Sequence, residues 1–252
     1  MKSDHKSRMR LDELLVRRGI FGSRSRARDA IDRGTVRVGG VLAAKAGAGV
    51  AQDAAITVED PARGYVSRAA LKLIAGLDHF GLDPSGRRAL DIGASTGGFT
   101  QVLLERGVRH VIAIDVGHGQ MDASLRTDPR VTCLEGLNAR DLDATHLRGV
   151  APDFLVSDVS FISLRLALLP ALKLASPGAI GIFLVKPQFE AGREAIGKGG
   201  LLRDPDDGAR VAENLRDWLD GIPGWRSMGL CPSPIEGGDG NREYLLAGVK
   251  DR

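Results

Sequence analysis

DIGASTGGF, residues 91–99, joins two segments of different hydrophobic periodicity. Residues 89–92 form an apolar run typical of a buried strand, and residues 97–106 carry apolar side chains at helical spacing. The three glycines permit a tight turn and a close approach of a ligand to the backbone. The spacing matches neither G-x-G-x-x-G nor a P-loop, which disfavours a pyrophosphate cradle. The stretch therefore predicts a strand, a glycine-rich turn and a helix, with or without a bound ligand.

The same alternation of strand and helix continues toward the end of the chain. Strands are expected at residues 89–92, 111–115, 131–134, 154–158, 180–186, 225–231 and 244–249, with further helices at 164–175 and 209–219. This order predicts an α/β fold with a doubly wound, mostly parallel, Rossmann-like sheet of about seven strands. Ligands of such sheets bind beyond the carboxyl ends of the strands, where residues 91–98, Asp115, Asp158 and Lys186 are expected.

The motif D-x-G-x-x-x-G-G-F resembles the first motif of methyltransferases that depend on S-adenosylmethionine. The resemblance implies S-adenosyl-L-methionine as the cofactor. Asp115 ends the next strand, and its carboxylate is expected to accept hydrogen bonds from both hydroxyls of a ribose. The expected cofactor contacts are Asp91, Gly93, Ser95, Thr96, Gly97, Gly98, Phe99 and Asp115, with Asn138 and Asp141 beside the adenine.

Two features reduce the number of chemical groups that could accept the methyl group. Residues 157–161, SDVSF, lack the Asn/Asp-Pro-Pro-aromatic motif usual in amino-group methyltransferases of this fold. Carbon-directed methylation of pyrimidines needs a cysteine nucleophile, and the only candidate, Cys231, also fits a buried structural thiol. A ribose 2′-hydroxyl needs alignment with the methyl group and loss of its proton. Lys186 is the expected base, if burial and a second lysine lower its pKa, and Asp158 is expected to orient it.

Residues 1–60 predict a small α+β domain upstream of the sheet. One helix ends at Gly19, a second runs from Ser23 to Gly34, and short strands follow, with a hairpin turn at Gly39-Gly40. RLDELLVRRGIFGSRSRARDAIDRGTVRVGG, residues 10–40, resembles the RNA-binding domain of the ribosomal S-four type, which implies structured RNA as the partner. The residues expected to contact RNA are Arg10, Arg17, Arg18, Arg24, Arg26, Arg28, Arg33 and Arg37.

The charge of the chain is unevenly distributed. Residues 1–38 contain 11 Lys/Arg and 5 Asp/Glu, a net charge of +6, whereas the rest of the chain carries −3. A concentrated basic segment indicates a polyanionic partner, although a solubilising basic tail has the same composition. Residues 61–66 include Pro61 and Gly64 and are expected to link the RNA-binding domain, residues 1–60, to the methyltransferase domain, residues 67–252.

Membrane and metal sites are not expected. No apolar run reaches the ~20 residues of a spanning helix. No apolar h-region follows the basic N-terminus, as a signal peptide would require. Cys133 and Cys231 provide neither a disulfide framework nor a zinc site, and they fit a reducing cytoplasm as the location.

Nearly the whole chain resembles the TlyA family, which is named both for haemolysin and for ribosomal RNA 2′-O-methyltransferase activity. The resemblance is carried by YVSRAALKL (65–73), LDIGASTGGFT (90–100), AIDVGHGQM (113–121), SDVSFISL (157–164), FLVKPQFEAG (183–192), GKGG (197–200) and GNREYLL (240–246). It implies cytidine ribose of ribosomal RNA as the methyl acceptor, ribosomal RNA or ribosomal subunits as partners, and a monomer or weak dimer.

The catalytic domain is similar to FtsJ-type enzymes, whose Lys-Asp-Lys-Glu tetrad falls on Lys72, Asp158, Lys186 and Glu243. Without the resemblance, Lys72 would be interpreted as a solvated lysine on a helix that buries Ala70, Leu71, Ile74 and Leu77. A non-catalytic RNA-binding assembly factor that retains the cofactor pocket is an alternative. A haemolysin is a further one, against which the lack of a spanning segment argues.

Overall fold

The computed structural model describes residues 8–251, so the first seven residues of the basic N-terminal segment lie outside the described residues. The chain divides into two compact units between Gly64 and Tyr65, a point that falls within the expected linker. Each unit has its own hydrophobic core.

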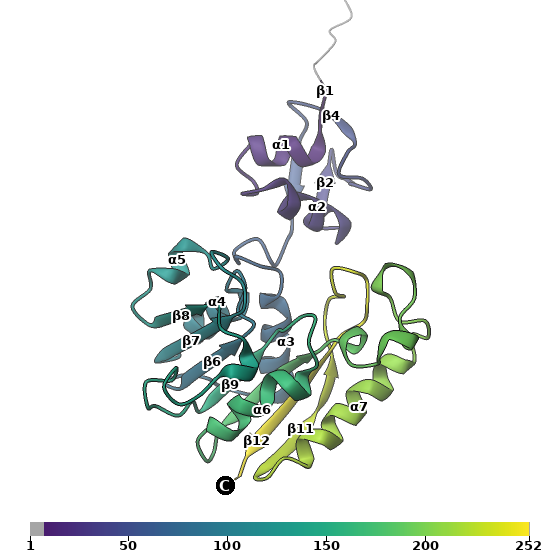
Figure 1. The fold of residues 1–252 in the computed structure, drawn as a ribbon. Helices are drawn as coiled ribbons and strands as arrows, with labels where there is room; N and C mark the ends of the chain where they lie inside the picture. The colour runs from purple at the N-terminus through teal and green to yellow at the C-terminus, as the bar shows by residue number, and fades with distance from the viewer. Residues whose placement is uncertain (1–7, 252) are drawn as a thin grey trace, which may run out of the picture. The chain divides into compact units, whose positions relative to one another are not determined.

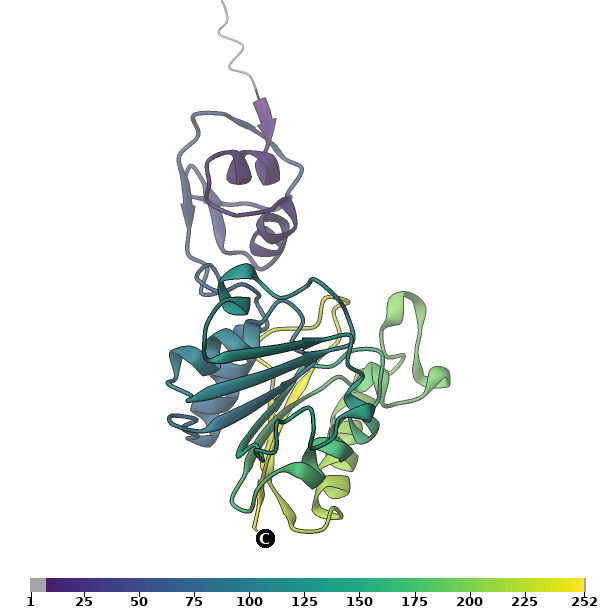
Figure 2. The same ribbon diagram turned by 60° about the vertical axis from the view of Figure 1, so that its left-hand side comes forward.

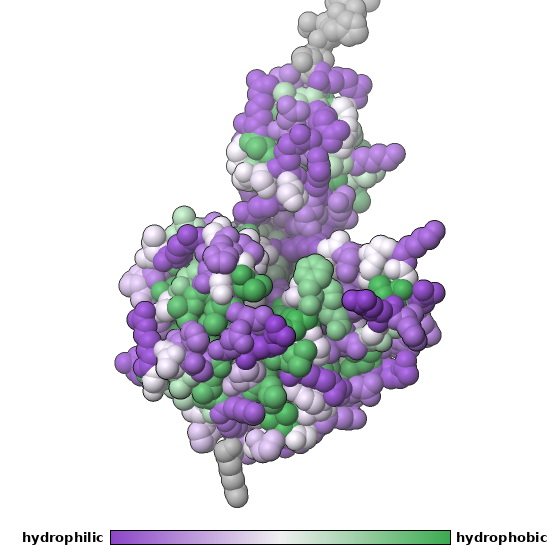
Figure 3. Space-filling model, in the orientation of Figure 1, coloured by the Kyte–Doolittle hydropathy of each residue, from purple (hydrophilic) through white to green (hydrophobic). Residues whose placement is uncertain are grey.

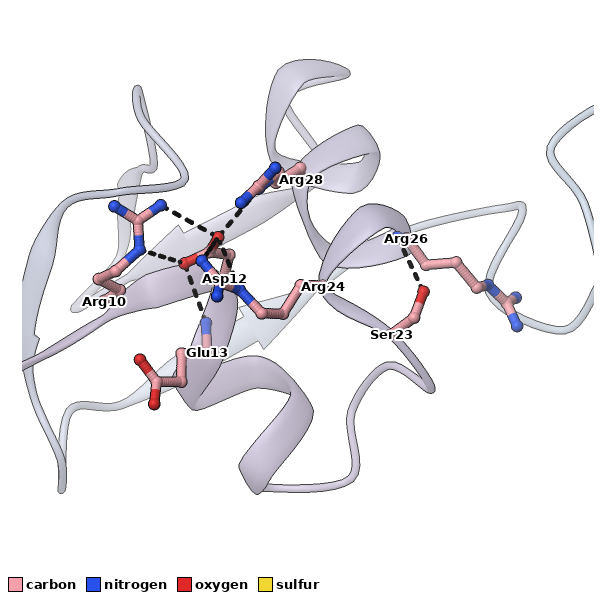
Figure 4. Close-up of polar contacts among 7 residues, drawn as sticks. All are labelled: Arg10, Asp12, Glu13, Ser23, Arg24, Arg26 and Arg28. Atoms are coloured by element: carbon pink, nitrogen blue, oxygen red, sulfur yellow. Dashed lines mark hydrogen bonds and ion pairs between the residues drawn. The ribbon is translucent and has the colours of Figure 1, made fainter.

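The N-terminal domain is a pair of short helices with short strands. Its elements are β1 (Arg8–Arg10), α1 (Leu11–Arg17), α2 (Arg24–Asp32), β2 (Val36–Val38), β3 (Val41–Leu42), β4 (Gly49–Ala51) and β5 (Ile56–Val58). Leu11 and Leu15 of α1 share one buried cluster with Ala27 and Ile31 of α2, as their helical spacing predicts. The Ser23 hydroxyl caps α2, which confirms the expected start of that helix (Figure 4).

Two small sheets complete this domain. Strand β2 pairs with β3 and β5, and the β2–β3 turn consists of Gly39 and Gly40, both with positive φ. Positive φ at both central residues is the geometry of a tight hairpin turn, which confirms the predicted hairpin. Strand β1 pairs with β4. The sequence did not predict β1, because Met9 is the only apolar residue of Arg8–Arg10.

The larger domain contains a seven-stranded sheet with helices on both faces (Figure 1). Its main elements are α3 (Ala70–Phe80), β6 (Arg88–Ile92), α4 (Gly98–Glu105), β7 (His110–Asp115), α5 (Ala123–Arg126), β8 (Val131–Glu135), β9 (Phe154–Ser157), α6 (Leu164–Leu174), β10 (Ile180–Val185), α7 (Asp207–Asp220), β11 (Trp225–Pro232) and β12 (Tyr244–Lys250). Short 3₁₀ turns are η1 (Ala139–Asp141), η2 (Pro187–Phe189), η3 (Arg193–Ala195) and η4 (Lys198–Gly200).

The strand order is β11-β12-β10-β9-β6-β7-β8. Strand β12 is antiparallel to β10 and β11, and the other neighbouring strands are parallel. This confirms the predicted doubly wound, mostly parallel sheet of about seven strands. Figure 2 shows the twist that such sheets acquire.

Helices α3 and α4 cover one face of the sheet, and α6 and α7 cover the other (Figure 1). Leu73 and Leu103 belong to the first core, and Leu168 and Leu215 belong to the second. The central strands are buried on both faces, which explains their continuous apolar runs. None of the helices between residues 8 and 251 has both the length and the apolar composition needed to cross a bilayer.

The carboxyl ends of β6, β7, β9 and β10 lie together at one edge of the sheet. The register pairs Ile92 with Ile114 and with Ser157, and Ser157 in turn with Phe183. The residues that follow these strands are therefore neighbours, as the doubly wound topology predicts.

Helix α3 differs from its prediction. It begins at Ala70 with Ala69 as its N-cap, and the Ser67 hydroxyl accepts a hydrogen bond from the Ala69 amide. Leu71 and Ile74 are only half-buried, while Leu73 is fully buried. The helix packs on β10, β11 and β12, and strands so distant in sequence set which face turns inward.

Candidate active site

The loop after β6 lies at the carboxyl edge of the sheet, and its backbone is tightly enclosed. Gly93 has φ +81°, and a Cβ there would lie 2.9 Å from Val159 Cγ1 and 3.0 Å from the Asp158 carbonyl oxygen. The amides of Gly93 and Ala94 donate hydrogen bonds to the Ile114 carbonyl. These contacts hold the loop between β7 and the segment after β9, so that only glycine fits at position 93.

Asp115 connects two loops at the end of β7. Its Oδ2 accepts a hydrogen bond from the Ser95 amide at 2.8 Å, and its Oδ1 accepts one from the Gly117 amide at 2.7 Å. Each carboxylate oxygen can accept a second hydrogen bond. Because Asp115 also lines a large cavity, its carboxylate is available to the hydroxyls of a bound ribose.

This cavity has a volume of about 990 Å³ and is bounded by the loops that follow β6, β7, β8, β9 and β10. Its walls include apolar side chains, Ile114, Val116 and Leu137, beside the polar side chains of Asn138 and Arg140. The size lies within the range of small-molecule sites. Apolar walls for a base, a carboxylate for a ribose and acidic groups for a cationic tail fit S-adenosylmethionine.

Asp91 is an acidic residue of a smaller neighbouring cavity. Its Oδ2 accepts a hydrogen bond from the Thr100 hydroxyl at 2.7 Å, whereas its buried Oδ1 has no hydrogen-bond partner within residues 8–251. Burial is the main cause that raises the pKa of Asp91 to about 7, and the nearby Asp158 carboxylate adds to the effect. Asp91 and Asp158 line one small cavity of about 150 Å³, where a cationic group would supply the missing partner.

Binding of S-adenosylmethionine is therefore expected to tighten as pH rises from 6 to 8. A cation favours the ionised form of Asp91, and that form becomes scarce below a pKa of about 7. The affinity should change by about tenfold over this interval. Calorimetric titrations at several pH values measure it. The Asp91→Asn variant is the control for ionisation of the ligand itself, and an equal pH dependence in both proteins would refute a role of Asp91.

Two ion pairs involve the four residues Lys72, Asp158, Lys186 and Glu243, and the Lys186–Asp158 pair lines the small cavity. The Lys186 Nζ lies 2.6 Å from Asp158 Oδ1 and donates a hydrogen bond to the Ser160 hydroxyl at 2.8 Å. The Lys72 Nζ lies 2.5 Å from Glu243 Oε2. Both pairs bring together residues from separate elements at the carboxyl edge of the sheet.

The two pairs form one cluster. Burial raises the pKa of Glu243, and the charges of Lys72, Lys186 and Asp158 all act on the same carboxyl group. The structure thus gathers the four residues to which the resemblance pointed. The interpretation of Lys72 as a solvated lysine is wrong: its side chain is only 6% exposed, because β12 brings Glu243 onto the buried side of α3.

A second cavity, of about 400 Å³, lies on the other side of Lys186. Lys186 and Ser160 line both this cavity and the small one beside Asp91, whereas Glu243 lines only the second. Phe161 stands at its rim with 90% of its surface exposed and φ +64°, and its ring centroid lies 5.1 Å from that of Phe189. Phe189 is partly buried, and both rings also line the large cavity. The exposed ring of Phe161, held in a strained conformation, is a candidate binding surface for a planar group.

Comparison with known proteins agrees with this geometry. The sequence model of a protein family described as FtsJ-like methyltransferase matches residues 65–250, and that of a family described as S4 domain matches residues 9–53. A Mycobacterium tuberculosis protein named 16S/23S rRNA (cytidine-2′-O)-methyltransferase TlyA is 46% identical over 244 residues, which are 95% of this chain and 89% of that protein. The chain belongs to the TlyA family.

Other TlyA-family proteins carry a different name. Hemolysin A of Brachyspira hyodysenteriae is 39% identical over 94% of this chain and 98% of its own length. A solved structure of a Streptococcus thermophilus protein, described as a hemolysin, superposes with a TM-score of 0.75 at 38% identity, covering 97% of this chain and 89% of that one. The fold, with its two domains, is therefore shared under both names.

The remaining predicted cofactor residues of this TlyA-family chain differ in their positions, and Ser95 lines both the large and the small cavity. Ser95 and Asn138 line the large cavity, and Thr96, Gly98 and Phe99 line the small one. Gly97 has φ +96° and occupies the N-cap of α4. Asp141 is exposed and lines none of these cavities, because the η1 turn directs Asn138 and Arg140 there instead.

Sequence reasoning missed two carboxylates that shape the TlyA-family site. Glu135, at the end of β8, accepts hydrogen bonds from the amides of Gly119, Gln120 and Met121 and so fixes the loop beside Asp115. Glu190 accepts hydrogen bonds from Ser163 and Leu164 and so fixes the loop that carries Phe161. A carboxylate that accepts hydrogen bonds from backbone amides cannot be recognised in the sequence except by its position after a strand.

The predicted RNA-binding arginines lie in the N-terminal domain of the TlyA-family chain, whose surface in Figure 3 is mainly hydrophilic. Arg10, Arg24 and Arg28 converge on Asp12. Arg17, Arg18, Arg26 and Arg37 donate hydrogen bonds to oxygen atoms of nearby loops. Arg33 is mostly buried between Asp29 and Asp60, which suits a structural role better than contact with RNA.

Proposed function

We propose that this chain is an S-adenosylmethionine-dependent methyltransferase that modifies the 2′-hydroxyl of cytidine in ribosomal RNA, in the cytoplasm. The observation that supports this most strongly is the cluster of the Lys186–Asp158 and Lys72–Glu243 pairs, in which Lys186 lines both the small cavity and the second cavity. The name of the Mycobacterium tuberculosis relative supports the same substrate class.

The residues of the large and the small cavity fit the cofactor. Asp115 would bind its ribose, Ile114 and Leu137 would contact its adenine, and Asp91 would face its cationic end. When bound, the cofactor supplies a methyl group on a sulfonium sulfur. The enclosed backbone at Gly93 keeps the loop close to that ligand.

Lys186 is the proposed acceptor of the hydroxyl proton. For this role the Nζ must be a neutral amine, whose lone pair would accept the proton as the ribose oxygen attacks. No negative charge would then remain on that oxygen, and the bound cofactor would supply the methyl group. Asp158 and Ser160 hold that nitrogen at a fixed point between the two cavities. Fixed alignment of acceptor, base and methyl group carries much of the rate gain in such a transfer. Lys72 and Glu243 border the same point and are proposed to orient the sugar.

The second cavity is the proposed site of the target nucleotide. Its Phe161–Phe189 pair presents ring faces on which an unstacked base can stack, which is how proteins commonly bind single-stranded RNA bases. The ribose of that base would then lie toward Lys186 and Glu243.

Transfer of a labelled methyl group to purified ribosomal RNA and to ribosomal subunits tests this proposal. Label in the RNA supports the enzyme. RNA binding without any label, with a bound cofactor, would instead support an assembly factor that retains the pocket. The comparison of free RNA with subunits also identifies which of them is the substrate.

Deletion of residues 1–60 is expected to weaken RNA binding and to flatten its dependence on salt. The basic arginines of this domain would neutralise phosphates, and each lost phosphate contact lowers the salt slope by about 0.7–0.9. Filter binding of ribosomal RNA between 50 and 300 mM salt, about the range in which such contacts weaken, measures both effects. Unchanged cofactor binding is the control for folding of the remainder. If the truncated protein bound RNA with the same affinity and slope, RNA docking by this domain would be refuted.

A further inference from the structure

Asp12 is a fully buried carboxylate surrounded by three arginines (Figure 4). Its Oδ1 lies 3.1 Å from the Arg10 Nε, and its Oδ2 lies 3.0 Å from the Arg24 Nη2 and 3.0 Å from the Arg28 Nε. Arg10 precedes α1, whereas Arg24 and Arg28 stand one turn apart on α2. A single carboxylate therefore fixes guanidinium groups from two elements of the domain.

Burial of a carboxylate is tolerated only when charged partners and hydrogen bonds compensate the lost hydration. Although burial acts in the opposite direction, the hydrogen bonds from Arg10, Arg28 and Arg24 hold the pKa of Asp12 far below its usual range. Asp12 is thus ionised under all working conditions. Three guanidinium groups and one carboxylate leave the cluster with a net charge of +2.

Asp12 accepts hydrogen bonds from only some of the N–H donors of the three arginines. Their side chains remain 47%, 48% and 51% exposed for Arg10, Arg24 and Arg28. The Nη1 groups of Arg10 and Arg24 and both Nη groups of Arg28 have no acceptor among residues 8–251. Asp12 itself is 0% exposed and cannot touch a ligand. The cluster thus offers fixed, outward donors of the kind that bind phosphate bidentately.

We propose that Asp12 is a positioning residue that holds Arg10, Arg24 and Arg28 as a preformed receptor for RNA phosphate groups. This inference rests on the proposed function and adds a role for a residue that repels RNA by its own charge. Free arginine side chains lose rotamer entropy when they bind, and prior fixation by Asp12 lowers that cost. The same fixation sets the spacing of the three guanidinium groups, and so selects RNA by the arrangement of its backbone.

The variant Asp12→Asn separates positioning from simple charge. It raises the net charge of the cluster from +2 to +3, so a charge effect alone predicts tighter RNA binding and an equal or steeper salt slope. Positioning predicts the opposite, because neutral asparagine holds the guanidinium groups less firmly. The dissociation constant for ribosomal RNA should rise by about tenfold, and the salt slope should fall by about 1–2.

Asp32→Asn is the matched control. Asp32 ends α2 in the same domain, is exposed, and has no ion pair within the described residues, so its replacement removes the same charge without touching the cluster. The full-length variants are compared by filter binding of deproteinised ribosomal RNA over a salt series. Asp32→Asn should bind at least as tightly as the natural protein, with an unchanged slope. Binding by Asp12→Asn that equals or exceeds that of the natural protein would overturn the inference.

Steady-state kinetics of methylation provide a second test of the role of Asp12. In Asp12→Asn, KM for RNA should rise while kcat at saturating RNA and cofactor affinity stay the same. A fall in kcat at saturating RNA would contradict a role confined to docking. If the natural protein neither binds nor methylates ribosomal RNA, the proposed function fails. If the natural protein does both and Asp12→Asn does so equally well, the proposed function stands and only the positioning role of Asp12 fails.

Arg28→Lys and Arg28→Gln keep the test valid if Asp12→Asn unfolds the domain. Arg28 is half-exposed, so both variants leave the buried carboxylate paired with Arg10 and Arg24. Lysine retains the charge but lacks the rigid fork of donors that joins Asp12 to a phosphate. Both variants should weaken RNA binding to a similar extent. Binding by Arg28→Lys equal to that of the natural protein would show that charge, and not fixed geometry, matters.

Discussion

Replacement of Lys186 by alanine is expected to reduce the rate of methyl transfer by about 10²–10⁴-fold, the range of general base catalysis. The loss should appear in kcat, because Lys186 is the proposed proton acceptor and its partners Asp158 and Ser160 remain in place. Single-turnover measurements with labelled cofactor determine the rate, and titrations determine cofactor and RNA affinity. Both affinities should be retained.

Lys173→Ala is the control for this prediction. Lys173 is an exposed lysine on α6, and its replacement removes the same charge from the same domain. It should transfer methyl groups at the natural rate. A Lys186→Ala variant that also did so would remove Lys186 from the reaction, and one that failed to bind cofactor would show a structural role instead.

Replacement of Lys72 by methionine is expected to destabilise the methyltransferase domain by about 3–5 kcal/mol, the cost of leaving a buried charge without its partner. Glu243 is 3% exposed, and Lys72 is its nearest cation. The penalty should grow with pH. Burial already raises the pKa of Glu243, so its folded form is protonated at low pH and the charge is then absent. The pKa of a glutamate in the unfolded chain is about 4.3. As pH rises above that pKa, ionisation of the buried Glu243 carboxyl becomes progressively more costly in the folded state.

The double variant Lys72→Met with Glu243→Gln separates stability from activity. Removal of both charges should restore most of the stability, since no unpaired buried ion remains. Activity should stay low, because both groups are proposed to orient the ribose. Chemical unfolding at pH 5 and pH 8 measures the first effect, and methyl transfer measures the second. Single and double variants of equal stability would contradict the ion pair, and a fully active double variant would contradict the catalytic role.

Within the cluster, the sequence predicted the positions of Lys186 and Asp158 better than those of Lys72 and Glu243. Lys186 and Asp158 stand directly after β10 and β9, and the topology of a parallel sheet places such residues at the ligand edge. Lys72 has no such signal. Its burial depends on Glu243, which is 171 residues away and reaches α3 only through the antiparallel strand β12. Resemblance could identify the pair, whereas periodicity suggested an exposed lysine.

Two other features, one in each domain, could not be predicted from the sequence for similar reasons. Asp12 lies in the first turn of a helix, where an acidic residue is ordinarily explained by the helix dipole. Its three partners were each predicted to contact RNA, but nothing in their spacing showed that they meet at one carboxylate. The exposed ring of Phe161 depends on a positive φ, which sequence patterns do not reveal for an aromatic residue.

Analysis of nucleosides from ribosomal RNA tests the central claim most directly. Unmodified ribosomal RNA or subunits are incubated with the natural protein and labelled S-adenosylmethionine, digested to nucleosides and separated by mass. Label is expected in 2′-O-methylcytidine, and it should be absent when Lys186→Ala replaces the natural protein. Label on a base carbon or nitrogen, or no label in RNA that the protein binds, would contradict it.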